Sequence, residues 1–223
     1  MSLLLGLCLF VAEALAGPGS VAVMYFQNQG NPELEPLKVG LTQMLTTDLV
    51  GAGGVTVVER TQLQALMDEL KLGHSAVVDK DTSSKLGKLL GAEYLILGSY
   101  FSLAGTLRVD ARLVRVETGE VVYASGSNGT VAEFLDIERK VAAGFRERIG
   151  QLIPGAVPPL PALAALTSAV GTGQPLDAAL KFSDGLIALD QHELPRARES
   201  FQAAIAADPR MDAARAQLAS MEL

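Results

Sequence analysis

The segment 94–125 constrains the fold of this chain more than any other, because it changes from a continuous apolar run to strict alternation. Residues 94–97 are all apolar, which predicts a strand inside a buried sheet. Over 107–113, aliphatic residues alternate with two arginines and an aspartate, which is typical of a strand with one wet face. Gly119 suits the left-handed position of a short hairpin loop leading into a strand at 121–125. The segment therefore predicts an antiparallel meander.

Two glycines flank the apolar run, and either a structural or a ligand-binding role would suit them. Gly91 follows a short helical pattern, and Gly98 comes directly after Leu97. Glycine takes positive φ at little cost and lets another backbone approach closely. We expect Gly91 to end a helix and Gly98 to bend the strand or to pack closely beneath a neighbour, with ligand binding as the alternative.

The residues before this segment alternate between short apolar runs and helical spacing. Apolar runs predict strands at 20–26 and 55–59, and helical spacing predicts helices at 37–49, 61–70 and 82–90. Thr61 and Asp81 are expected to cap the last two helices. A longer helix follows the meander, with its apolar face formed by Phe134, Ile137, Val141, Phe145, Ile149 and Leu152.

The predicted order is therefore β-α-β-α-α-β-β-β-α. Helical crossovers join the early strands and the last three strands form the meander, so we predict an α/β (α+β) fold with a mixed five-stranded sheet and packed helices.

Composition and charge limit the functional classes. The 223 residues are 49% hydrophobic, enough for a real core. The formal charge is −7, and the 18 basic residues form no run, which argues against nucleic-acid binding and against anionic membranes.

Residues 1–16 are similar to a secretory signal peptide, with an apolar stretch and a small-residue site at Ala14 to Ala16. A first buried helix is the alternative. The single cysteine, Cys8, lies in this stretch, and Leu7 stands where a lipoprotein signal needs a small residue. We therefore predict an exported, soluble, periplasmic protein without disulfides, peripheral to the outer membrane if attached at all, and with no membrane-spanning segment in the mature chain.

The carboxy-terminal part reads as a separate helical unit. Residues 154–175 are rich in Pro, Ala and Gly and predict a linker. Over 176–223, with Asp177 counted as zero, five residues match the tetratricopeptide offsets 8, 20, 24, 27 and 32. These are Gly185, Ala197, Phe201, Ala204 and Pro209. One repeat cannot bury its own apolar face, so we expect it to dock on the main domain or on another chain.

Protein binding is the activity that we expect of this unit. The candidate residues are Gly185, Ala197, Phe201 and Ala204 with the repeat surface around them, together with an unidentified edge of the sheet. No catalytic, cofactor-binding or metal-binding residue is assigned. The partners are expected to be proteins of the bacterial envelope, and a homo-oligomer is one form that the assembly can take.

One string has an enzyme-like pattern. Asp79 and Asp81 are spaced like the two carboxylates of a haloacid-dehalogenase-type phosphatase, but Thr82 comes one place too early. Capping of a helix by Asp81 is the competing interpretation. His74 and His192 lie in separate modules, and the glycines of 51–54 follow a helix instead of preceding one, which does not suit a dinucleotide loop.

Four stretches resemble the CsgG family of curli secretion components, with kinship to the TolB amino-terminal domain. They are "VAVMYF", "VVERTQLQALMDELKL", "KLGKLLGAEYLILGSY" and "ARLVRVETGEVVYAS", within residues 20–150. The most specific marks are ERxxL, at Glu59, Arg60 and Leu63, and TGE, at Thr118, Gly119 and Glu120.

This resemblance implies a periplasmic, non-enzymatic role in assembly or export at the envelope. The gaps at 102–106 and 126–132, where the pore-forming member carries its membrane hairpins, are too short for membrane-spanning strands. Three hypotheses follow: an adaptor or assembly factor, a ring-forming accessory subunit of a secretion channel, and a phosphatase using Asp79 and Asp81.

Overall fold

A computed structural model of the 223-residue chain describes residues 19–50, 55–72, 80–153 and 174–222. The predicted signal peptide, the glycines of 51–54, Asp79, His74 and nearly all of the linker lie outside the described residues. The domain boundaries based on them therefore stay predictions.

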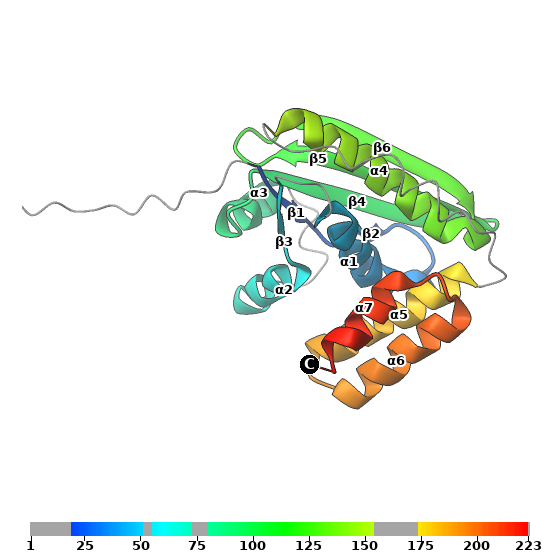
Figure 1. Cartoon of the computed structure of the whole chain (residues 1–223). Coiled ribbons are helices and arrows are strands. Elements are labelled where there is room, and N and C mark those ends of the chain that lie inside the picture. The colour runs from blue at the N-terminus through cyan, green and yellow to red at the C-terminus, as the bar shows by residue number, and fades with distance from the viewer. Residues whose placement is uncertain (1–18, 51–54, 73–79, 154–173, 223) are drawn as a thin grey trace, which may run out of the picture.

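A mixed six-stranded sheet forms the centre of the fold (Figure 1). Its strands are β1 (Ser20–Val23), β2 (Gln27–Asn28), β3 (Thr56–Val58), β4 (Tyr94–Leu103), β5 (Thr106–Arg115) and β6 (Val121–Thr130). The strand order is β3-β1-β4-β5-β6, with β1 parallel to β3 and β4, and β4, β5 and β6 antiparallel. The predicted α/β class and the predicted meander are confirmed.

The prediction of five strands was wrong by one. Strand β2 pairs in parallel with the far half of β4, through Gln27 opposite Ser99 and Asn28 opposite Tyr100. Two polar residues carry no periodic signal in the sequence. They form a strand only because they pair with β4. The same cause lengthens β6, which continues from 125 to Thr130 through serine, glycine and asparagine because it follows the register of β5.

The helices of the sheet domain are α1 (Leu37–Val50), α2 (Arg60–Glu69), α3 (Lys80–Leu89) and α4 (Phe134–Leu152), with short 3-10 turns at Pro32–Leu34 and Val131–Glu133. Helices α1 and α4 contact each other and pack on one face of the sheet. Alternate β5 residues, Leu107 to Leu113, are buried on this face. The predicted caps were wrong: α2 begins at Arg60 after Glu59, and α3 begins at Lys80, so Thr61 and Asp81 lie inside first turns.

The two glycines that flank the apolar run have structural roles, as predicted. Gly91 follows α3 with a φ of +65°, and its amide donates to the carbonyl of Lys88. A Cβ on Gly98 would lie 2.2 Å from the ring of Phe26, so this glycine lets Phe26 pack against the strand.

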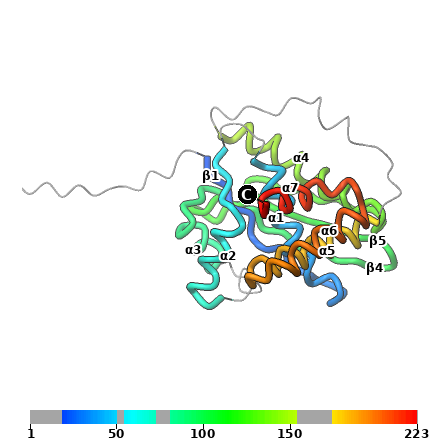
Figure 2. The backbone as a smooth tube through the Cα atoms, turned by 60° about the horizontal axis from the view of Figure 1, so that its bottom comes forward, coloured from blue at the N-terminus to red at the C-terminus, as the bar shows by residue number. Residues whose placement is uncertain are grey.

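Three helices form the carboxy-terminal unit: α5 (Pro175–Asp190), α6 (Leu194–Ala207) and α7 (Asp212–Ser220). Helices α5 and α6 pack together, with the rings of Phe182 and Phe201 5.8 Å apart. The unit docks on α1 of its own chain, as Figure 2 shows from a second direction. At this contact a Cβ on Gly40 would lie 2.2 Å from the Ser183 hydroxyl oxygen. Among the described residues, no helix is both long and apolar enough to cross a membrane.

Candidate functional site

The four residues predicted to bind protein lie between α5 and α6. Ala197, Phe201 and Ala204 are fully buried, and the ring of Phe201 occupies the space that a side chain at Gly185 would need. These residues therefore hold the two helices together, and a partner that meets the unit in this conformation contacts their exposed neighbours. Protein binding by this surface and its assignment as a tetratricopeptide repeat stay predictions.

Arg60, the arginine of the ERxxL motif, links the sheet domain to the helical unit. Its guanidinium donates two hydrogen bonds to the carboxylate of Asp190 in α5, at 2.8 and 2.9 Å, and others to Tyr25 and Gln43. Burial lowers the pKa of Arg60, but the hydrogen bonds and charge interactions with Asp190 and Tyr25 together outweigh this effect and raise it. With 2% of its side chain exposed, Arg60 is part of an internal contact and not of a substrate site.

A second polar cluster lies in a cleft of about 440 Å³ between α1, α4 and the start of α7. Glu138 is 3% exposed, and its Oε1 has no hydrogen-bond partner within the described part of the chain. Burial raises the pKa of Glu138 well above its usual range, and the nearby carboxylate of Asp48 raises it further. Burial likewise raises the pKa of Asp48, against the influence of Arg146 and Arg139.

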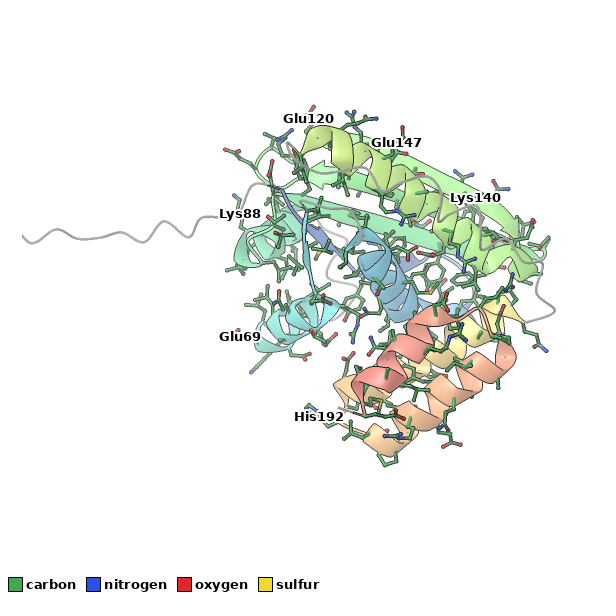
Figure 3. All side chains as sticks on the ribbon, viewed as in Figure 1. Glu69, Lys88, Glu120, Lys140, Glu147 and His192 are labelled. Atoms are coloured by element: carbon green, nitrogen blue, oxygen red, sulfur yellow. The ribbon has the colours of Figure 1, made fainter. Side chains whose placement is uncertain are left out.

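The enzyme-like residues are only partly described. Asp79 and His74 lie outside the described ranges, so the phosphatase interpretation stays untested. His192 lies in the turn between α5 and α6, at the outer end of the helical unit (Figure 3), with a φ of +61°. Within the described ranges, no group of three or more His, Cys, Asp or Glu side chains is placed to hold a metal ion.

The face of the sheet opposite α1 and α4 presents mainly polar and small side chains, and we call it the polar sheet face. In register across β4, β5 and β6, its residues are Leu97, Arg112 and Ala124; Ser99, Asp110 and Gly126; and Phe101, Arg108 and Asn128. A hollow of about 470 Å³ lies over this face, beside Gln27 and Gln29. Helix α3 covers the same face of the sheet at the end away from this hollow, where Gly87 lies against Leu95 and Val116.

Small residues in β6 shape this face. The guanidinium of Arg108 pairs with the carboxylate of Asp110 at 2.7 Å, and a Cβ on Gly126 would lie 2.2 Å from that carboxylate. The ion pair therefore lies over Gly126 of β6, and a larger side chain at this position would displace it. As a result, charged groups of β5 lie close to the outer edge of the sheet.

The outer edge of β6 is open, since no strand in the described part of the chain pairs with it. The amide of Arg115 donates to the carbonyl of Glu120, so Arg115 points its main chain toward β6. Main-chain groups alternate along an antiparallel ladder, and Tyr123, Ser125 and Ser127 therefore face β5. It follows that Ala124, Gly126 and Asn128 point their amide and carbonyl groups outward.

The sequence predicted binding at a sheet edge but did not identify that edge as β6, although part of the signal was present. The alternation of Arg108, Asp110 and Arg112 predicts the wet face correctly. The serine, glycine and asparagine residues that extend β6 are uncommon in strands, so the length of the edge appears only in the structure.

A model of the family described as curli production assembly/transport component CsgG matches residues 9–105. The match covers a little under half of the chain and includes the ERxxL motif. The resemblance of residues 106–150 has no such match and stays a prediction. Comparison with curated proteins finds no similar sequence.

Several solved structures are similar to part of the chain. The LpoB C-terminal domain from Salmonella enterica is 20% identical with a TM-score of 0.43, over 53% of this chain and 87% of that one. Lipoprotein GNA1162 from Neisseria meningitidis is 15% identical with a TM-score of 0.44, over 51% and 81%. TolB from Acinetobacter baumannii is 13% identical with a TM-score of 0.40, over 60% and 29%. These distant likenesses carry no functional argument.

Proposed function

We propose that this protein is a non-enzymatic adaptor or assembly factor of the bacterial envelope, located in the periplasm, that binds a protein partner along the edge of β6. The observation that carries this proposal is the open edge of a ten-residue strand, with the main-chain groups of Ala124, Gly126 and Asn128 directed outward. The match of residues 9–105 to the CsgG family supports the envelope setting.

The chemistry of the edge suits the addition of a strand. Main-chain groups supply affinity when an extended segment joins a sheet, and they need a partner strand that side chains do not obstruct. Ala124 and Gly126 leave this approach clear on the polar sheet face. On the other face α4 packs against β6, so the edge is supported and keeps its register.

Proline substitutions on the edge test this proposal. Proline removes an amide hydrogen, and at Ala124 or Asn128 that hydrogen points outward, so the ladder with β5 stays intact. We expect Ala124→Pro and Asn128→Pro to lose the partner in a cross-linking pull-down from the envelope fraction. Ala124→Ser, which keeps the amide and a small side chain, should retain it, and circular dichroism should be unchanged for all three variants.

The helical unit provides the comparison. Glu199→Lys alters an exposed position of α6 and leaves β6 untouched. If this variant loses the partner and the proline variants keep it, binding belongs to the helical unit and the edge proposal is wrong.

A second candidate function rests on the same edge. An unpaired strand can also pair with another copy of its own chain, as a ring-forming accessory subunit would require. Light scattering on the processed protein separates the two functions. A stable monomer that still captures a partner contradicts the ring, whereas an oligomer dispersed by Ala124→Pro supports it.

A further inference from the structure

An apolar groove of about 260 Å³ lies at the α3 end of the polar sheet face. Its aliphatic walls are Leu95, Leu97, Val114 and Val121, with Ser83 and Ser84 of α3 on one side. Val121 is 51% exposed, and it is the first residue of β6. The groove therefore reaches the same strand whose outer edge is open.

Arg112 lies where this groove meets the larger polar hollow, since Leu97 and Arg112 line both. The other two arginines of β5 have acidic partners: Arg108 pairs with Asp110 at 2.7 Å, and Arg115 pairs with Glu93 at 3.7 Å. Arg112 is exposed, and the described residues place no carboxylate within 4.0 Å of it. A cation beside an apolar groove fits a ligand that offers a carboxylate next to a large apolar group.

The register of the sheet places Arg112 in reach of an added strand. Arg112 lies directly opposite Ala124 and Val114 lies opposite Val121, so a β-bulge sets three steps of β6 against two steps of β5. A strand that joins β6 would run about 4.7–4.9 Å beyond it. The residue opposite Ala124 would then share a row with Arg112, and the methyl group of Ala124 leaves the arginine free to reach over it.

We infer that the segment bound at β6 is extended, carries Asp or Glu opposite Ala124, and spans the bulge with the two-residue spacing of β5. This spacing sets a large apolar residue two positions along, over the Val114 and Val121 row. This inference rests on the proposed function of the β6 edge and adds the chemical class of the partner. The acid pairs with Arg112, and the apolar side chain covers the exposed part of Val121. The motif reads acid-x-apolar or apolar-x-acid, according to the direction in which the strand joins.

Selection from a displayed library of random peptides tests the motif. The probe is a set of peptides of the same length as β6, ten residues, selected on the full-length chain. We expect enrichment of Asp or Glu two positions from Leu, Ile or Phe. Replacing the acid of the best peptide by its amide should weaken the Kd about tenfold, as expected for one charged hydrogen bond.

Variants of the chain separate the two claims. On Arg112→Glu the enriched acid should change to Lys or Arg, and on Val121→Thr the apolar preference should weaken. Arg198→Glu, on α6, serves as the matched control and should change neither. This inference would be wrong if the peptides keep their preference for an acid on Arg112→Glu. If the same peptides no longer bind Ala124→Pro, the edge proposal still stands. Binding that survives Ala124→Pro, or no enrichment at all, would overturn both.

Discussion

Two polar clusters lie where the helical unit covers the sheet domain, and they are built in opposite ways. At one, Arg60 and Asp190 form a two-pronged ion pair whose donors and acceptors are satisfied by each other and by Tyr25 and Gln43. At the other, Glu138 is buried beside Asp48 with an oxygen that no described residue satisfies. The first contact fixes the unit, whereas the second leaves a cleft under α7.

The difference follows from the geometry of the charges. A guanidinium and a carboxylate match in shape, so two parallel hydrogen bonds offset the removal of both groups from water. Two neighbouring carboxylates repel each other, and burial adds to the cost of ionising either one. The contact at Arg60 should therefore be sensitive to truncation, whereas the contact at Glu138 should tolerate replacement.

The largest effect should come from Arg60→Met. Truncation leaves Asp190 without its partner at a largely buried contact, which costs about 3–5 kcal/mol in the free energy of unfolding. Urea denaturation followed by circular dichroism measures this loss. Arg60→Lys keeps the charge but not the two parallel hydrogen bonds, so it should lose less stability than Arg60→Met. An equal loss of stability in both variants would contradict a role for the two-pronged geometry.

A middle-sized effect should come from the packed contact of α1 with α5. Gly40→Leu would force a side chain toward Ser183 and the carbonyl of Ala179, at an expected cost of about 1–3 kcal/mol. Gly40→Ala combined with Ser183→Ala makes room for one methyl group. Because alanine favours a helix over glycine by about 1 kcal/mol, this double variant should match or exceed the wild-type stability in the same assay.

Replacement of Glu138 should have a smaller effect, and of opposite sign. Glu138→Leu removes a buried carboxyl group that is costly to ionise. It should raise the free energy of unfolding by about 1–2 kcal/mol at neutral pH. The raised pKa of Glu138 means that the folded chain keeps this proton after the unfolded chain has lost it. Stability should therefore fall as the pH rises from the usual carboxyl range to the folded pKa.

Urea titrations at several pH values test this sign. Glu138→Gln keeps a polar group but cannot titrate, so it should flatten the fall without the full gain of Glu138→Leu. Asp48 contributes a slope of the same sign, because burial raises its pKa too. A wild-type stability that rises over this range of pH would contradict the description of the cleft.

How far the sequence predicts these features depends on whether the signal is local. Apolar runs and helical spacing predicted the order of strands and helices, because the polarity of each side chain indicates whether that position is buried. Position 138 falls on the buried face of α4, four residues after Phe134 and three before Val141, but its charge hid this. The Arg60 and Asp190 pair joins residues 130 positions apart, and no local pattern reports such a contact.

The smallest effect should come from an exposed ion pair inside the helical unit. Comparing it with the Arg60 pair shows how much of the stability comes from charge and how much from burial. Arg198 and Glu222 lie 3.6 Å apart, with 45% and 67% of their side chains exposed. Water screens this pair, so Arg198→Ala should cost about 0.5 kcal/mol or less in the urea assay, and less still at high salt. A cost near that of Arg60→Met would mean that charge alone fixes the unit. The expected gap between the two variants instead assigns the stability to the buried fork.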